Sequence, residues 1–333
     1  MTAIIRYSIV FMFGLMIFGC SKDSTTSPTS SGATNSTLVG NWQVLSGVSG
    51  AKYLAYHADN VYYYLNQYGN GLRGIDGGVA QVSDNTINIA QTIYNFSVKG
   101  DTLFFSSPSQ TVTLLRSTTA PSDSQWVKTV NVLDTLTPPI PEATDMAING
   151  NIMWYGNAYS SHNLYKINLT TRAVDTLPTT NYAWAVEWDG TNLWTSSDGS
   201  TTIYKVNPTT GANISTSVDM GAWIYGIAWD GVSLWCSSWN EETMYRYDPA
   251  TNTVLNTYPL GRNVEIGGLA YVAGSLYVCA HGVINKCTAS PFATVSAYQI
   301  AGYYAAGIAY DGTNFWVSTY QGNKYMVFKV ALQ

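Results

Sequence analysis

The stretch Gly226-Ile-Ala-Trp-Asp-Gly231, with Leu234-Trp235 just after it, decides the fold because versions of it recur along the chain. Each version has small and aliphatic residues, then a turn, and then an aliphatic–aromatic pair. The last aromatic recurs at Trp154, Trp194, Trp235, Tyr277 and Trp316, so the steps are 40, 41, 42 and 39 residues. Such a regular period is the signature of a repeat protein in which each repeat is one supersecondary unit.

Turn residues divide each repeat into four strands. In the third repeat we expect strands over Gly226–Trp229, Ser233–Ser237, Met244–Tyr247 and Thr253–Tyr258. Asp230-Gly231 joins the first two strands as a tight hairpin, and Asp248-Pro249 turns the chain into the fourth. Four antiparallel strands in about 40 residues are typical of a β-propeller blade, whose first strand lies next to the propeller axis.

The two ends of the repeat region predict how the ring closes. The last repeat has no fourth strand, because its third strand, Tyr325–Val330, runs almost to Gln333. Before the first repeat lies Val132-Leu133-Asp134-Thr135-Leu136, which nearly matches the first repeat's own fourth strand, Ala173-Val174-Asp175-Thr176-Leu177. We therefore predict that the N-terminal copy supplies the missing strand and that five inner strands give five blades.

The region from Leu38 to Ser117 predicts a separate small all-β domain. Its expected strands are Trp42–Ser46, Tyr53–His57, Val61–Gln67, Gly78–Val82, Thr86–Gln91, Ile93–Val98, Thr102–Ser106 and Thr111–Arg116. Short strands in this number favour a closed or nearly closed antiparallel barrel, which leaves no exposed sheet edge. Gly40-Asn41-Trp42, together with Asn95-Phe96-Ser97-Val98 and Asp101-Thr102-Leu103, resembles the lipocalin-like domains of bacterial lipoproteins, and that resemblance implies such a barrel.

The N-terminus has the features of an exported, lipid-anchored protein. Arg6 precedes an apolar run from Tyr7 to Phe18, which is long enough for a secretory signal but too short to span a bilayer. Ile17-Phe18-Gly19-Cys20 resembles the lipobox of bacterial lipoproteins, and the resemblance implies cleavage before Cys20 and acylation of that residue. Ser21–Thr37 is Ser/Thr-rich, as expected of a flexible tether. An ordinary signal peptide followed by a chance cysteine is the alternative.

These features predict the order of domains and the location. We expect a signal peptide over residues 1–19, a lipidated Cys20 with its tether over 20–37, the barrel over 38–117, a linker over 118–124 and the propeller over 125–333. The lipid on Cys20 would anchor the protein in the bacterial cell envelope. The outer membrane is the expected membrane, with the folded part either periplasmic or surface-exposed.

Composition excludes two broad classes of protein. Lys and Arg number 15 against 20 Asp and Glu, giving a net charge of −5, and charged residues are only 11% of the chain. Aromatic residues make up 14%. Disordered chains show the opposite balance, and nucleic-acid binders need a basic excess to neutralise phosphates. We therefore expect a folded protein with no nucleic-acid partner.

The sequence shows no motif for catalysis, cofactor binding or metal binding. Gly69-Asn-Gly-Leu-Arg-Gly74 matches Gly-x-Gly-x-x-Gly, but strand-like sequence follows it where a phosphate site needs a helix, so we interpret it as a loop. His57, His162 and His281 have no zinc-site spacing. The chain has no Gly-x-Ser-x-Gly elbow and no P-loop. We expect neither a cofactor nor a metal.

Besides Cys20, the chain has three cysteines, an odd number. Cys279 and Cys287 flank the His281-Gly282 turn, so one interpretation is a disulfide across a hairpin. The other, equally consistent with the spacing, is that both are buried thiols like Cys236.

A propeller gathers on one face the loops before its inner strands and those between its second and third strands. The candidate ligand-binding residues in these loops are Trp184, Trp223, Tyr225, Trp239, Glu265, Tyr303 and Tyr304. Aromatic platforms with a few carboxylates suit carbohydrates or peptide segments. For each aromatic, packing between blades is the alternative role. Glu187 is a further candidate, because it places an acid on an inner strand where the other repeats have Ala.

From Val127 onward the repeats resemble bacterial propellers of the streptogramin-lyase and glutaminyl-cyclotransferase type, through motifs such as Gly226-Ile-Ala-Trp-Asp-Gly231. The cyclotransferase family is five-bladed, in agreement with the blade count. Its Glu-Ser-Thr-Gly run has no counterpart here, so the resemblance implies a fold and no catalytic residue. We expect a membrane-anchored module that binds a carbohydrate or a peptide. A cyclotransferase-like or lyase enzyme with its site at the propeller axis, and a structural component of an envelope complex, are the alternatives.

Overall fold

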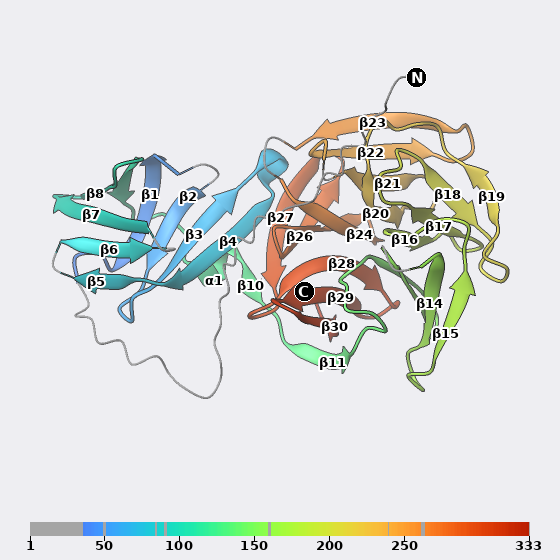
Figure 1. The fold of residues 1–333 in the computed structure, drawn as a ribbon. Coiled ribbons are helices and arrows are strands. Elements are labelled where there is room, and N and C mark those ends of the chain that lie inside the picture. Colours follow the sequence, from blue (N-terminus) through green and yellow to red (C-terminus); the bar gives the residue numbers. More distant parts are fainter. Residues whose placement is uncertain are drawn as a thin grey trace, which may run out of the picture.

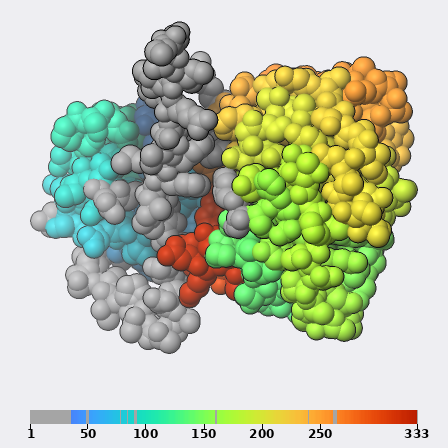
Figure 2. All heavy atoms as spheres, turned by 45° about the vertical axis from the view of Figure 1, so that its right-hand side comes forward, coloured from blue at the N-terminus to red at the C-terminus, as the bar shows by residue number. Residues whose placement is uncertain are grey.

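The fold is shown in Figure 1 as a computed structural model, which describes residues 36–332 apart from 49–50, 84, 90–91, 159–160, 239 and 261–263. The predicted signal peptide, Cys20, almost all of the tether and Trp239 lie outside the described residues. A curled sheet, blue to cyan, and a propeller, green to red, form two neighbouring lobes (Figures 1 and 2). Within the described residues, no helix is long and apolar enough to cross a membrane.

The propeller has the five blades that the repeats predict, each with four antiparallel strands built outward from the axis. Blade 1 contains β12 (Met146–Asn149), β13 (Ile152–Tyr155), β14 (Asn163–Asn168) and β15 (Val174–Pro178). Blade 2 contains β16 (Val186–Trp188), β17 (Leu193–Ser196), β18 (Ile203–Val206) and β19 (Asn213–Thr216). Blade 3 contains β20 (Ile224–Trp229), β21 (Leu234–Ser238), β22 (Thr243–Asp248) and β23 (Thr253–Pro259).

The two remaining blades each take a strand from the N-terminal side of the repeats. Blade 4 contains β24 (Ile266–Val272), β25 (Ser275–Ala280), β26 (Val283–Ala289) and β27 (Phe292–Gln299), and β10 (Lys128–Thr129) pairs in parallel with β27. Blade 5 contains β28 (Tyr304–Tyr310), β29 (Phe315–Gln321) and β30 (Lys324–Val330), with β11 (Val132–Leu136) as its outer strand. The predicted ring closure by β11 is therefore confirmed, whereas the addition of β10 was not expected.

Three blades fasten their first hairpin with the same set of side chains. In blade 3, Asp230 Oδ1 accepts the N–H groups of Val232 and Ser233, at 3.0 and 2.6 Å. Asp230 Oδ2 accepts the indole N–H of Trp235 at 3.1 Å and a guanidinium N–H of Arg246 at 2.9 Å. The same arrangement joins Asp189 to Trp194 and Lys205, and Asp311 to Trp316 and Lys329. In each of these blades one carboxylate therefore bonds the hairpin turn, the buried indole N–H and a Lys or Arg side chain.

The N-terminal lobe is a curled antiparallel sheet and does not confirm the predicted lipocalin-like barrel. Its strands are β1 (Gly40–Ser46), β2 (Ala51–Tyr56), β3 (Val61–Gln67), β4 (Arg73–Val79), β5 (Gln81–Ser83), β6 (Thr86–Ile89), β7 (Thr92–Lys99), β8 (Thr102–Ser106) and β9 (Thr111–Arg116). They form one open sheet in the order β4-β3-β2-β1-β9-β8-β7-β6-β5. Because its two end strands do not pair with each other, the sheet is a curled half-barrel.

The difference arises at the predicted strand Gly78–Val82, which is divided between β4 and β5 at Ala80. Strand β4 starts at Arg73, within the stretch that we interpreted as a loop, and only its Gly69–Gly71 part forms a short 3-10 turn. Gly77 makes β4 compatible with its neighbour, because a Cβ there would collide with the ring of Tyr63. Gly69 and Gly71 therefore lie in a turn, as the loop interpretation expects, whereas Gly74 lies in a strand.

The two lobes are fastened together at the end of β4. Leu72 is fully buried in the same core cluster as Leu260, which follows β23 of blade 3. The backbone N–H of Arg73 donates to Asn285 Oδ1 at 2.8 Å, and Asn285 Nδ2 donates back to the Arg73 carbonyl at 3.2 Å. Helix α1 (Asp123–Trp126) lies between the lobes, and the indole N–H of Trp126 donates to the carbonyl of Asn66 at 3.2 Å. Buried leucines and hydrogen bonds therefore hold the two lobes together at this point.

Candidate functional site

The face that gathers the loops before the inner strands holds an aromatic pair from blades 2 and 3. The rings of Trp184 and Tyr225 meet edge to face, with centroids 4.8 Å apart. Tyr225 is only 7% exposed, and its hydroxyl lies 3.5 Å from Asp198 Oδ1. Trp184 is half-buried. Tyr225 therefore packs against Trp184, and Trp184 is the more exposed member of the pair.

Trp223 precedes the inner strand of blade 3 and is also half-buried. Its backbone N–H donates to Asn240 Oδ1 at 3.0 Å, which ties it to the loop after β21. Ser238 Oγ donates to the same Asn240 oxygen at 2.8 Å. The loop that carries Trp223 is thus fixed to its neighbour by side-chain hydrogen bonds, as a binding loop on a rigid scaffold should be.

Blades 4 and 5 place a second aromatic group on this face. The Tyr304 hydroxyl donates to Glu265 Oε2 at 2.6 Å, and the Tyr304 ring stacks on Tyr320 with centroids 4.8 Å apart. Glu265 is exposed. Burial, and after it the Glu265 charge, raise the pKa of Tyr304 well above its ordinary value. Tyr304 therefore remains a neutral hydrogen-bond donor at physiological pH.

Tyr303 does not join this group. Its ring packs edge-on against Phe328 of β30, with centroids 4.8 Å apart, and it belongs to the core between blades 4 and 5. Tyr303 and Tyr304 are neighbours in a strand-like segment, and alternation sends their side chains to opposite sides. Of these two sequence candidates, only Tyr304 reaches the loop face.

The N-terminal lobe also contributes side chains that the sequence analysis did not single out. Tyr68, just after β3, stacks on His281 with centroids 4.0 Å apart and ring planes 9° apart. Asn66 of β3 donates to Asp76 of β4. No repeat pattern could have indicated these residues, because they lie outside the repeats and reach blade 4 only through the docking of the two lobes.

Glu187 occupies the inner strand β16, as the sequence predicts. Its Oε1 accepts the backbone N–H of Trp229 of blade 3 at 3.1 Å. Burial raises the pKa of Glu187 to about 8, although backbone hydrogen bonds from Trp229 and Trp188 oppose the shift. Glu187 is thus an acid that carries its proton near neutral pH and is held by an adjacent blade.

Asp145, which the sequence analysis missed, lies deeper still, with 2% of its surface exposed. Its two oxygens accept the backbone N–H groups of Ile227 at 3.4 Å and Ile308 at 3.3 Å. Burial raises the pKa of Asp145 well above its ordinary value. One carboxyl therefore joins the inner edges of blades 1, 3 and 5 at the axis.

A comparison of the repeats could have found Asp145. The equivalent positions hold only small residues, namely Ala185, Gly226, Gly268 and Gly307. Gly268 has to lack a side chain, because a Cβ there would collide with Asp145 Oδ1. A single acid in a column of small residues is the signal, just as it is for Glu187 among alanines.

The disulfide between Cys279 and Cys287 is not formed. Both thiols are free and buried, and so is Cys236. Cys279 pairs in register with Ile284, whereas Cys287 pairs with Leu276, so the two cysteines lie on opposite faces of the blade. They belong to different core clusters. The described residues also contain no group of His, Cys, Asp and Glu side chains that could hold a metal ion.

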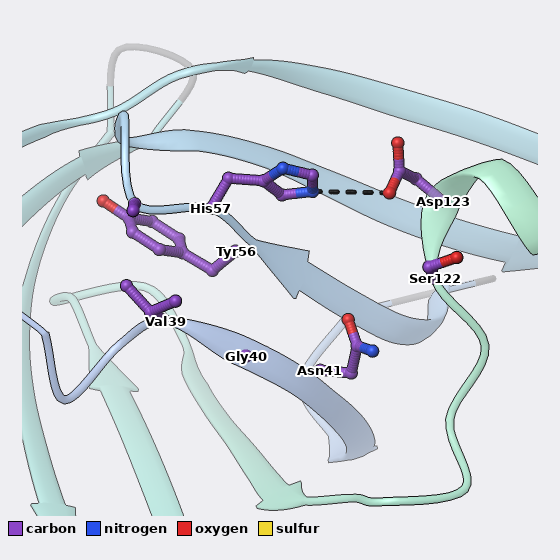
Figure 3. Close-up of a pocket in the computed structure, with 8 residues that line it drawn as sticks. Val39, Gly40, Asn41, Tyr56, His57, Ser122 and Asp123 are labelled. Carbon is purple, nitrogen blue, oxygen red and sulfur yellow. Dashed lines mark ion pairs between the residues drawn. The ribbon is translucent and has the colours of Figure 1, made fainter.

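A pocket of about 310 Å³ lies away from the propeller face, beside helix α1 (Figure 3). Its lining includes Gly40, Asn41, Tyr56 and Ser122. In Figure 3 the His57 ring points toward Asp123, and His57 Nε2 lies 3.3 Å from Asp123 Oδ1. Apart from this ion pair the lining offers few converging polar groups, so we do not assign a function to it.

Known proteins resemble this chain in fold but not in sequence. No protein-family model matches it, and neither does any curated protein sequence. A glutaminyl cyclase structure from Myxococcus xanthus is 12% identical with a TM-score of 0.52, and the alignment covers 62% of this chain and 97% of that one. A streptogramin B lyase structure is 15% identical with a TM-score of 0.38, covering 90% and 96%. At such low identity the similarity to the glutaminyl cyclase structure supports the propeller fold and no particular activity.

Proposed function

We propose that the protein is a non-catalytic binding module whose propeller face binds a carbohydrate or a peptide. The observation that carries the proposal is the placement of aromatic rings on three blades at one face. Trp184 and Trp223 lie on blades 2 and 3, and Tyr304 with Tyr320 on blade 5. Rings presented by several blades suit an extended ligand that stacks on more than one of them.

The axial carboxyls also favour binding over catalysis. Asp145 accepts backbone N–H groups from two other blades, and Glu187 accepts one from blade 3. An acid that holds the ring together in this way has fewer lone pairs left for a substrate. Binding on the loop face needs neither of them.

Arrays of glycans and peptides, followed by affinity measurements on variants, test the proposal. Trp184→Ala and Trp223→Ala should each weaken binding of the array ligand by about 1–3 kcal/mol, as stacking anchors do, with little loss of stability. Tyr303→Ala is the control, because Tyr303 packs in the core and should lower stability without a specific effect on affinity. An array without any ligand, or Trp variants that bind as wild type does, would contradict the proposal.

An enzyme with its site at the axis is the second candidate, and the raised pKa of Glu187 favours it. A carboxyl with a pKa of about 8 can exchange a proton near neutral pH. Glu187→Gln separates the two functions, since Gln keeps an oxygen that can accept the Trp229 N–H but cannot transfer a proton. A binding module retains its ligand affinity in this variant, whereas an enzyme loses turnover of the same ligand.

The same variant has a defined effect on stability. The folded protein keeps the Glu187 proton that the unfolded chain releases above pH 4.5, so the free energy of unfolding should fall as pH rises from 4.5 to about 8. Glu187→Gln should remove that fall and be the more stable form at the upper pH. Thermal melts of both proteins at the two pH values measure the difference.

We further propose that an acylated Cys20 holds this module in the bacterial cell envelope. The supporting features are the lipobox-like Ile17–Cys20 and the polar tether after it. Cys20→Ala should release the protein from the membrane fraction, because the tether has no apolar surface of its own. Retention of that variant in membranes after a high-salt wash would contradict the proposal.

A further inference from the structure

Aromatic rings and two carboxylates meet where the N-terminal lobe touches the propeller. This junction cluster consists of Tyr68, Asp76, Glu265, His281, Tyr304 and Tyr320. Tyr68 follows β3, and Asp76 lies in β4 of the curled sheet. Glu265 and His281 lie in loops of blade 4, and Tyr304 and Tyr320 lie in strands β28 and β29 of blade 5. Neither lobe holds the whole cluster alone, so it exists only in the docked protein.

The junction cluster is held rigidly. His281 adopts the left-handed backbone conformation in the turn between β25 and β26, and its N–H donates to the Glu265 carbonyl at 3.0 Å. The Glu265 N–H donates to His281 Nε2 at 3.2 Å. Gly282 must lack a side chain, because a Cβ would lie 2.6 Å from the ring of Tyr304. The backbone thus fixes the positions of the rings and carboxylates.

The described part of the junction cluster contains two carboxylates and no Lys or Arg. Asp76 accepts from Asn66, and Glu265 accepts from Tyr304, so each carboxylate bonds a neutral side chain. Among the described residues, no Lys or Arg lies within ion-pair distance of either one. Desolvation by the surrounding protein raises the pKa of Asp76, while the hydrogen bond from Asn66 and the charge of His281 oppose the shift. The Glu265 charge makes a smaller contribution that raises the pKa further. A bound cation would relieve this repulsion.

Free acceptors remain for such a cation. Asp76 Oδ1 and Glu265 Oε1 accept no hydrogen bond from any other residue in the described part of the chain. The Tyr304 hydroxyl contacts Glu265, and burial together with the charges of Asp76 and Glu265 raises the pKa of Tyr68 and of Tyr304. An ammonium group has three donors and is attracted to aromatic faces. Carboxylates and rings together therefore fit an ammonium group better than a neutral hydroxyl.

We propose that the junction cluster binds an amino sugar through its ammonium group. The inference builds on the proposed binding function and names the chemistry of one ligand class. In an amino sugar the ammonium is attached directly to a flat pyranose ring, so one residue can stack on a tyrosine and meet the carboxylates at once. A lysine side chain would have to order its flexible stem first, at a cost in conformational entropy.

Calorimetric titration of the full-length protein with two matched oligosaccharides tests the inference. The probes are a glucosamine oligomer and an N-acetylglucosamine oligomer of equal length, which differ in the charge on each amine. The glucosamine oligomer should bind at least about tenfold more tightly, a difference of about 1.4 kcal/mol. Asp76→Asn and Glu265→Gln should each abolish that preference.

Two further variants test whether the preference for the glucosamine oligomer depends on the junction cluster itself. Asp175→Asn removes one exposed carboxylate from the outer strand β15 and should leave the preference intact. Tyr304→Phe keeps the ring but removes the hydroxyl that holds Glu265, so it should reduce the preference without unfolding the protein. If Asp175→Asn lowers the preference as much as Glu265→Gln does, net charge explains the binding and the inference is overturned.

Other outcomes separate this inference from the proposed function. Equal binding of the two oligomers, or tighter binding of a lysine peptide than of the glucosamine oligomer, overturns the amino-sugar assignment. If the arrays still give a neutral ligand whose affinity depends on Trp184, the proposed binding function survives that result. Another outcome is that the arrays give no such ligand while glucosamine binding depends on Asp76 and Glu265. In that case the amino-sugar site at the junction cluster is supported, and the proposed ligand binding at Trp184 is contradicted.

Discussion

Blades 3 and 1 have the same strands and the same hairpin length, yet only blade 3 satisfies its buried tryptophan. In blade 3 the indole N–H of Trp235 donates to Asp230. Blade 1 has Asn149 at the position of Asp230, and the buried Nε1 of Trp154 finds no acceptor among the described residues. A buried donor without a partner costs about 1–3 kcal/mol. The presence of this carboxylate therefore decides whether the buried indole N–H of the blade has a hydrogen-bond acceptor.

Blade 4 also lacks that carboxylate, but it has no indole N–H that would need it. It has Tyr277 in place of the tryptophan, and its hairpin is Val272-Ala-Gly-Ser275, without an Asp. Lys286 still lies over the ring of Tyr277, at 5.7 Å from the centroid. Because tyrosine has no indole N–H, blade 4 leaves no such donor unpaired. Blade 4 therefore lacks both the acid and the indole, whereas blade 1 lacks only the acid.

The largest effect should come from removing the packing residue itself. Trp235 is 2% exposed, so Trp235→Ala should cost about 3–5 kcal/mol of stability through lost burial and the cavity left behind. Trp154→Ala should cost less, because it also removes an unsatisfied donor. Chemical denaturation of both variants measures the two costs. Equal costs would mean that the Asp230 contact adds nothing to blade 3.

Removing the carboxylate should have the next largest effect. Asp230→Ala leaves Trp235, Arg246 and two turn N–H groups without their shared acceptor, so we expect a loss of about 2–4 kcal/mol. Asn149→Ala is the matched control in blade 1 and should change stability by less than about 0.5 kcal/mol. A loss at Asn149 as large as that at Asp230 would remove the distinction between the blades.

The propeller could be predicted from the sequence because its information is local and repeated. The aromatic at the end of each pair, from Trp154 to Trp316, marks the blades, and the copy of a fourth strand at Val132–Leu136 reveals the closure. The closed or nearly closed barrel is not confirmed, since the sheet is a curled half-barrel and pairing between the ends of a sheet has no local signature. The glycines of Arg73–Val79 looked like turn residues but serve a strand.

The candidate site was predictable only in part. Trp184, Trp223, Glu265 and Tyr304 come from loops whose place in the repeat indicates one face, and the structure puts them there. Tyr68 and Asp76 could not be assigned, since their position depends on how two lobes dock, which no single-sequence pattern encodes. Asp145 could have been found by aligning the inner strands.

Acid should weaken the blades that have the carboxylate more than blade 1. Burial alone would raise the pKa of Asp311, but the hydrogen bonds from Lys329, the turn and Trp316 outweigh it and hold that pKa below its ordinary value. Stability from this group is therefore present above the unfolded pKa and lost as pH falls through the folded one. Between about pH 7 and about pH 2.5, the melting temperature should fall further in wild type than in Asp311→Asn. Parallel curves for the two proteins would exclude this contribution.

The smallest expected effect is a gain, from giving blade 1 the acid that blade 3 has. In Asn149→Asp the new carboxylate would occupy the position of Asp230, with the Trp154 indole N–H and Lys166 placed as Trp235 and Arg246 are in blade 3. We expect an increase in stability of about 0.5–1.5 kcal/mol, the net worth of one buried hydrogen bond. Asn149→Ser, which lacks the charge, should not reproduce it. The gain should also disappear in the double variant Asn149→Asp/Trp154→Phe, because phenylalanine has no N–H to donate. If that double variant keeps the gain, the carboxylate acts on the turn alone, and the buried indole is not what distinguishes blade 1 from blade 3.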